Sequence, residues 1–157
     1  MLTHHRKSVC LSLISADLPI WSVVETAATL YQKDSERFHL LLTEPPLQDP
    51  QSLEDSDAIT TPRLLWLNIS PYRVTMTKQG NGQVSYRHSW EQGAYGLSRY
   101  WLRNQSLKGN EQMCLHNFTC RLTLTGHPLP EHLRLEYELW SEKLQLGRYI
   151  LNLEIHH

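Results

Sequence analysis

The stretch LRLEYELWSEKLQLGRYILNLEI, from Leu133 to Ile155, decides the fold more than any other part of the chain. Its apolar residues recur at every second position, which is the period of a β-strand with one buried face. The alternation changes phase once, after Gly147. The stretch therefore predicts a long antiparallel β-hairpin that contains a β-bulge.

Glycine tolerates the unusual backbone of a bulge, so Gly147 is the expected unpaired residue. The pairing that keeps all apolar side chains on one face sets Leu139 opposite Leu146 and then skips Gly147. It continues with Tyr137 opposite Tyr149, Leu135 opposite Leu151 and Leu133 opposite Leu153. On the other face it brings Glu138 near Arg148, as a cross-strand ion pair.

The composition is that of an ordinary soluble globular protein. The chain has 157 residues, 40% apolar and 20% charged, with a formal net charge of −1. This length fits a single domain, 1–157, and the near-neutral charge makes nucleic acid an unlikely partner. No apolar run approaches the roughly 20 residues of a membrane span. The three cysteines, an odd number, and the weak signal-like character of the N-terminus favour the cytoplasm.

An amphipathic helix is expected early in the chain. Asp17 can cap it, and Pro19 is tolerated in its first turn. The apolar residues that follow have spacings of 0, 3, 4, 7, 8 and 11, one stripe of a helix, and are Ile20, Val23, Val24, Ala27, Ala28 and Tyr31. The helix is expected to end near Lys33.

Most of the remaining chain alternates as β-strands do. Strands are expected at 9–13, 38–42, 63–69, 72–76, 84–90 and 114–125, with Leu97 to Leu107 ambiguous between strand and helix. In the last of these strands one face is expected to be core, and it consists of Cys114, His116, Phe118, Cys120, Leu122 and Leu124. The segment 44–61 holds three prolines and five acidic residues and reads as a flexible loop.

Together these elements predict an α+β fold. One N-terminal amphipathic helix packs on a curved, mostly antiparallel sheet or partial β-barrel of about six to eight strands, which ends in the bulged hairpin.

The most promising candidate site is a segment rich in arginine and aromatic residues. Three arginines and five aromatic residues fall between Tyr86 and Arg103, with Glu91 the only acid. Such groups stack on planar ligands, grip carboxylates or anchor protein partners. The alternative is that the aromatic residues are core and the arginines face solvent. The residues expected to bind a partner or ligand are Arg87, His88, Arg99, Trp101 and Arg103.

No cofactor, metal or catalytic residue is expected. Cys114, His116 and Cys120 resemble zinc ligands, but about 20 Å of extended strand separates the two cysteines. The paired histidines at the two ends of the sequence, His4-His5 and His156-His157, read as solvated chain ends. The carboxylates Glu136, Glu138 and Glu154 read as partners of nearby arginines. Nucleophile and phosphate-loop motifs are missing from the sequence.

Two short segments resemble the bacterial chorismate–pyruvate lyases. They are Ser98-Arg99-Tyr100-Trp101-Leu102-Arg103 and Leu146-Gly147-Arg148-Tyr149, ten residues in all. The resemblance implies a small α+β enzyme built on an antiparallel sheet, with Arg103 as the carboxylate-binding arginine and Glu154 as the nearest candidate acid. The chain departs from the family pattern after the second segment, where the closing strand is missing or reduced to Ile150 to His157.

These observations favour a non-catalytic, cytoplasmic accessory domain that binds another protein. The acidic segment 44–61 is then a candidate to cover the basic, aromatic segment until a partner displaces it. The alternative is a small enzyme or carrier for an anionic carboxylate ligand held by Arg87, Arg99 or Arg103.

Overall fold

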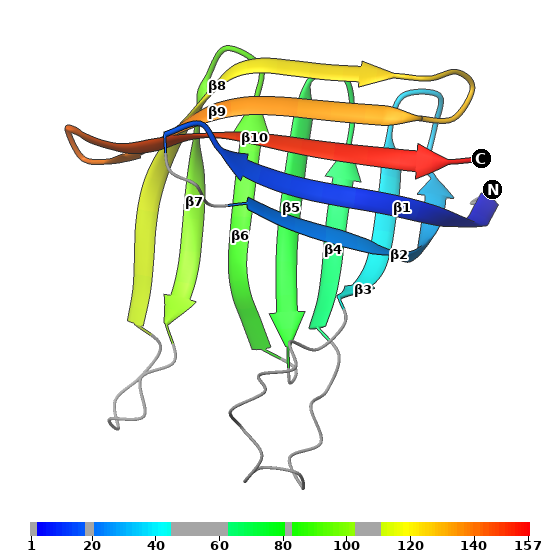
Figure 1. Ribbon diagram of the computed structural model, residues 1–157, viewed down its shortest axis with the longest axis horizontal. Coiled ribbons are helices and arrows are strands. Elements are labelled where there is room, and N and C mark those ends of the chain that lie inside the picture. Colours follow the sequence, from blue (N-terminus) through cyan, green and yellow to red (C-terminus); the bar gives the residue numbers. More distant parts are fainter. Residues whose placement is uncertain (1–2, 18–20, 45–62, 81–82, 103–110) are drawn as a thin grey trace, which may run out of the picture.

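The computed structural model describes residues 3–17, 21–44, 63–80, 83–102 and 111–157. Within these ranges the chain forms ten β-strands and no helix (Figure 1). The strands are β1 (Thr3–Ser15), β2 (Trp21–Gln32), β3 (Phe38–Glu44), β4 (Arg63–Ile69), β5 (Arg73–Gly80), β6 (Gln83–Glu91), β7 (Tyr95–Leu102), β8 (Glu111–Thr125), β9 (His132–Ser141) and β10 (Leu144–His156). The described part of the chain contains no helix that could cross a membrane.

The ten strands form one closed antiparallel barrel. Each strand pairs with its neighbours in the sequence, and β1 pairs with β10 to close the ring. Figure 1 shows β1, β2, β9 and β10 crossing in front of the more upright strands β4 to β6. The predicted α+β fold with a partial barrel of about six to eight strands is therefore wrong. Closure gives every one of these strands a paired neighbour on both sides over at least part of its length.

The expected N-terminal helix is the strand β2. It pairs with β1 from Trp21, opposite Ile14, to Gln32, opposite Thr3. The apparent helical stripe mixes residues from both faces of this strand: Val24 and Ala28 point inward, whereas Val23 and Ala27 point outward. The exposed apolar side chains at the start of the strand hide its period of two.

The terminal hairpin has the predicted register but not the predicted bulge. Tyr137 lies opposite Tyr149, and the two leucine pairs that follow are also as expected. Gly147, however, is paired with Leu139 and buried, and the register shift leaves Leu146 as the extra residue. A side chain at position 147 would meet the Tyr149 ring, whose hydroxyl lies 3.2 Å from the Cβ position. The register sets Glu138 opposite Arg148, but the Glu138 carboxylate accepts a hydrogen bond from Gln145 instead.

The predicted core face of β8 is wrong for its first half. Cys114 and His116 are exposed, whereas Asn117 and Thr119, which follow them on the strand, are fully buried. A register shift between Thr119 and Arg121 then changes the phase. After this irregularity the inner face carries the leucines of the predicted face, Leu122 and Leu124.

Two other expectations concern residues that the structure describes in part. The ambiguous segment 97–107 is a strand as far as Leu102, the end of β7, and residues 103–107 lie outside the described ranges. The predicted loop 44–61 begins at the last residue of β3, and 45–61 also lie outside them.

The interior of the barrel has two chemically different parts. One part is aliphatic, with fully buried leucines contributed by β2, β3, β4, β9 and β10. The other part holds aromatic and polar side chains from β6 to β9. We call it the interior polar cluster, and its members are His88, Trp90, Ser98, Tyr100, Asn117 and Tyr137.

Candidate functional site

The predicted site residues lie on opposite faces of the barrel wall. Arg87 on β6 and Arg99 on β7 are both exposed on the outer face and occupy directly opposite positions. Trp101 shares their face, two residues beyond Arg99 on the same strand. His88 points into the barrel and is 5% exposed. Arg103 lies outside the described residues.

The two arginines belong to a row that crosses the outer face. The register places Leu41, Trp66, Thr77, Arg87 and Arg99 side by side on five successive strands. This row carries two cations and no acid. Like charges directly opposite each other destabilise a sheet, so the pair of guanidinium groups favours the presence of an anion.

A groove with a volume of about 690 Å³ lies over four residues of this row, which are Leu41, Trp66, Thr77 and Arg87. Arg99 does not line the groove but lies beside Arg87 at its edge. Its walls combine the aromatic side chains Tyr31 and Trp66 with polar groups from β3, β5 and β6. The Arg87 Nε atom donates a hydrogen bond to Thr77 Oγ1 at 3.2 Å, which holds the guanidinium group at the groove. Thr77 is only 6% exposed although it points outward, so it forms the floor. We call this depression the outer groove.

A second depression of about 280 Å³ extends the outer groove toward the β2–β3 and β4–β5 turns. The two depressions share three lining residues, which are His39, Asn68 and Thr75. Lys33, Arg37 and Arg73 line the far end. The outer groove therefore has cationic side chains at both ends.

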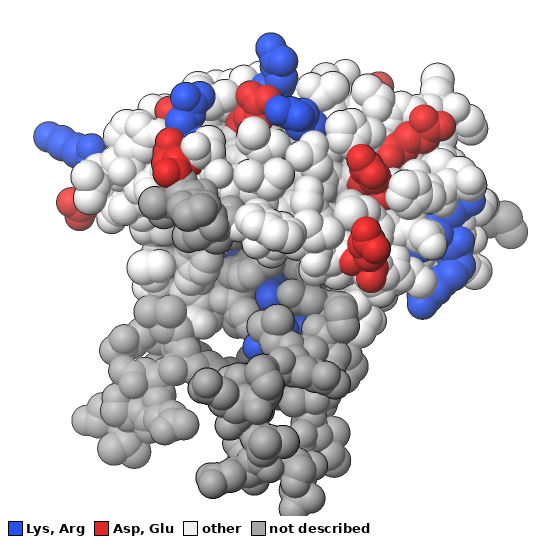
Figure 2. Space-filling model, in the orientation of Figure 1, with Lys and Arg blue, Asp and Glu red and all other residues white. Residues whose placement is uncertain are grey.

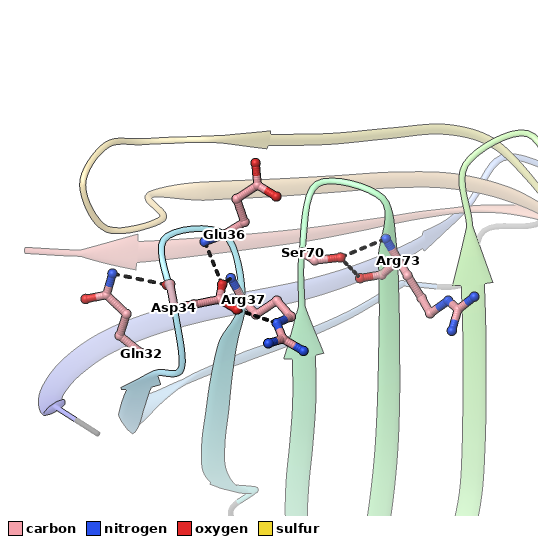
Figure 3. Close-up of polar contacts among 6 residues, drawn as sticks. All are labelled: Gln32, Asp34, Glu36, Arg37, Ser70 and Arg73. Atoms are coloured by element: carbon pink, nitrogen blue, oxygen red, sulfur yellow. Dashed lines mark hydrogen bonds and ion pairs between the residues drawn. The ribbon is translucent and has the colours of Figure 1, made fainter. Parts of the chain in front are cut away.

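Local hydrogen bonds fix these two turns (Figure 3). The Asp34 carboxylate accepts from the backbone N–H groups of Glu36 and Arg37, at 2.9 and 2.8 Å, and from Arg37 Nε at 2.6 Å. Ser70 Oγ accepts from the Arg73 N–H and donates to the Arg73 carbonyl oxygen. Side chains that bond to nearby backbone in this way stabilise tight turns.

The electrostatics of the turn end follow from these contacts. The Glu36 backbone N–H, and after it the Arg37 side chain, lower the pKa of the Asp34 carboxyl group. Burial, with a smaller contribution from Lys33, lowers the pKa of His39. Arg73 is paired with Glu91 at 3.3 Å. His39 is therefore neutral at neutral pH, and the positive charge of the outer groove comes from lysine and arginine.

The opposite side of the barrel has a different surface. Figure 2 shows acidic and basic side chains interspersed over β1, β2 and the neighbouring strands. Glu154, the acid that the lyase resemblance implied, is exposed on β10 opposite Cys10 and His132. Three strands separate β10 from β6 in the barrel, so Glu154 and Arg87 do not share a site.

The interior polar cluster surrounds His88. The imidazole stacks on the Trp90 ring with 4.9 Å between centroids and 5° between planes. Its Nδ1 atom lies 2.7 Å from Ser98 Oγ. Burial lowers the pKa of His88 to about 4, so the ring is neutral at neutral pH.

Sequence reasoning missed several residues of both regions. Trp66 lies on an apolar strand, and the buried positions Leu65 and Leu67 on either side of it show that it points outward. The sequence does not show this alternation, because Leu64, Leu65, Trp66 and Leu67 are all apolar. Ser98 and Asn117 also gave no signal, because a polar residue at an inward position resembles an outward one in the sequence.

Comparisons with known proteins bear on the fold alone. No protein-family model matches the chain, and no curated protein sequence matches it. Its fold is similar to that of a solved structure, the ywiB protein from Bacillus subtilis. The TM-score is 0.60 at 12% sequence identity, and the match covers 99% of this chain and 94% of that one. At this identity the similarity supports the barrel architecture and says nothing of function.

Proposed function

We propose that this protein is a non-catalytic accessory protein that binds an acidic, extended segment of a partner protein in the outer groove. The observation that carries the proposal is the pair Arg87 and Arg99, which lie opposite each other in a row without an acid. A carboxylate placed between the two guanidinium groups would relieve their repulsion and accept charge-assisted hydrogen bonds.

The shape of the outer groove supports an extended peptide. Along β5 the distance from Arg73, at the turn end, to Thr77, under Arg87, is four residues, or about 13 Å at 3.3 Å per residue. A peptide of about five residues spans this length. With an acid at each end it would meet cations at both ends of the groove, and a central aromatic residue would lie beside Trp66 and Tyr31.

The non-catalytic role rests on the position of the polar groups. Among the described residues, the closest pairing of a histidine with a hydroxyl nucleophile is His88 with Ser98, and Ser98 is fully buried inside the barrel. A substrate in the outer groove has no access to it. We also propose a cytoplasmic location, because the three cysteines are all free thiols, the form kept in a reducing compartment.

The proposal is tested with synthetic peptides and charge-reversal variants. The fluorescein-labelled peptide Glu-Ala-Phe-Ala-Glu should bind in a fluorescence anisotropy titration, and the matching peptide with lysine at both ends should not. Arg87→Glu and Arg99→Glu should each weaken binding by about ten-fold or more, because each places a like charge against the peptide carboxylate. Lys143→Glu is the matched control, since Lys143 is exposed in the turn between β9 and β10.

Two results would contradict this function. Equal binding of the acidic and basic peptides would show that the arginines do not select the ligand. Tighter binding of a ten-nucleotide deoxythymidine oligomer than of any acidic peptide, lost in the same two variants, would make the outer groove a nucleic-acid surface instead.

A further inference from the structure

A chain of hydrogen bonds with a fixed direction runs through the interior polar cluster. Asn117 Nδ2 donates to the Ser89 carbonyl oxygen at 3.1 Å and to Ser98 Oγ at 2.9 Å. A carbonyl oxygen only accepts, so the amide nitrogen must face Ser89. Both amide hydrogens are then used, and Ser98 Oγ is an acceptor from Asn117.

The direction continues through the histidine. Ser98 is fully buried, so its own hydroxyl hydrogen needs an acceptor, and His88 Nδ1 lies 2.7 Å away. A neutral imidazole that accepts at Nδ1 carries its hydrogen on Nε2. His88 Nε2 faces the Tyr100 hydroxyl at 3.5 Å and therefore acts as the donor there.

Tyr100 is the last member of this chain. Because its oxygen accepts from His88, its hydroxyl hydrogen points away from the imidazole. Tyr100 lies two residues before the end of β7, at the end of the barrel where β3 and β5 also end. Tyr100 is half-buried, in contrast to Ser98 and Asn117. The cluster thus presents one oriented hydrogen-bond donor near this end of the barrel.

Positively charged side chains share the inner face at this end. The register aligns Lys78, Tyr86 and Tyr100 on three successive strands. Lys78 Nζ lies 5.6 Å from the centre of the Tyr86 ring, and that ring lies 6.1 Å from the Tyr100 ring. Arg63 belongs to the inward-facing series of β4, two residues before the buried Leu65, and its Cγ lies beside Gly80.

The shape of the molecule agrees with this placement. Figure 1 shows β4, β5 and β6 continuing beyond β2 at this end. Figure 2 shows Lys or Arg side chains on the same side of the molecule, below β2. Around these polar groups the inner face is apolar, and its half-buried members packed on the core include Leu13, Val24, Tyr86 and Tyr149.

We propose that this end of the barrel interior is a second binding site, for a small amphipathic carboxylate. One carboxylate oxygen accepts the hydrogen of Tyr100, the charge lies near Lys78 and Arg63, and an apolar body of the ligand contacts Tyr86 and Tyr149. The site is separate from the outer groove, because its side chains are on the other face of the same strands.

The direction of the chain is tested first, by nuclear magnetic resonance. The ¹⁵N chemical shifts of His88 should show an unprotonated Nδ1 and a protonated Nε2 at pH 7. The opposite tautomer would reverse the chain and overturn the proposal, because Tyr100 would then donate to His88.

Binding is tested by calorimetry with 4-phenylbutyrate, 4-phenylbutanol and 4-phenylbutylamine. The acid should bind more tightly than the alcohol, and the amine should not bind. Tyr100→Phe keeps the ring and removes the hydroxyl group, and it should weaken binding of the acid by about ten-fold or more. Tyr72→Phe is the control, since Tyr72 is 64% exposed and outside the barrel.

The expected pattern is loss of acid binding in Tyr100→Phe alone. Failure of all three compounds to bind at millimolar concentration would overturn the proposal. So would acid binding that Tyr100→Phe leaves unchanged, because the carboxylate would then lie elsewhere. Unfolding curves for Tyr100→Phe show whether a loss of binding reflects a loss of fold.

Discussion

Lowering the pH from 7 to 4 should cost this protein about 3 kcal/mol of folding stability through His88 alone. Burial lowers the pKa of this histidine from 6.5 to about 4 in the folded state. As the pH falls below 6.5, the His88 imidazole becomes protonated in the unfolded chain but stays neutral in the folded chain. The stabilising effect is therefore complete above pH 6.5 and lost by about pH 4. A tenfold difference in proton affinity between the two states corresponds to about 1.4 kcal/mol.

The effect is measured by urea unfolding of wild type and His88→Gln at intervals between pH 7 and pH 4. The variant removes this titration, and the other titrating groups, including Asp34, act equally in both proteins. The free energy of unfolding of wild type should therefore fall more steeply with acid than that of the variant. Parallel curves would show that His88 titrates normally in the folded protein and is not enclosed as described.

Replacement of Gly96 by alanine should destabilise the barrel by about 3 kcal/mol or more. A Cβ atom at this position would lie 2.0 Å from the Ser89 carbonyl oxygen and 3.0 Å from Asn117 Oδ1. The backbone of β6 cannot move away without breaking the contact between Ser89 and Asn117, which begins the hydrogen-bond chain to His88.

Gly93→Ala is the matched comparison for this prediction. Gly93 is close in the sequence, but no atom of the described residues beyond its chain neighbours lies within 4 Å of its Cβ position. The destabilisation caused by Gly93→Ala should therefore come from backbone strain alone, because the φ of Gly93 is +68°, and it should be about 1 kcal/mol. Denaturant unfolding of the two variants distinguishes the effect of a steric clash at position 96 from the effect of backbone strain at position 93. Equal free energies of unfolding would show that Gly96 is not closely packed against Ser89 and Asn117.

Strands whose apolar residues lie on a single face could be predicted from the sequence. The hairpin at Leu133 to Ile155 alternates on both sides of a single phase change, and its central pairs have the predicted register. The predicted position of its bulge is wrong, because the prediction assumes that a glycine at a phase change is the irregular residue. In the structure Gly147 is needed instead as a small paired residue against the Tyr149 ring, and Leu146 tolerates the exposed bulge.

The helix prediction at 17–33 failed for a different reason. Apolar residues occur on both faces of β2, with Trp21 69% exposed and Ala28 fully buried. Pairing with β1 and β3 decides the conformation of such a segment, and long-range pairing leaves no local signal. Among the candidate site residues, alternation correctly predicted that Arg87 and His88 point to opposite faces of their strand. The neighbours that complete each site come from other strands, and the alternation of one strand does not identify them.

The seam between β1 and β10 has a consequence for the order of folding. One edge of β1 pairs with β2, and the other edge pairs with β10 over the eight residues from Ser8 to Ser15. Asp17 also accepts a hydrogen bond from the Arg148 N–H across 131 positions. During synthesis on the ribosome, the edge of β1 that pairs with β10 therefore stays unpaired until nearly all of the barrel has been synthesised. Such distant pairing slows folding and exposes nascent chains to aggregation. The yield of folded protein should therefore depend on chaperones that bind incompletely paired sheets.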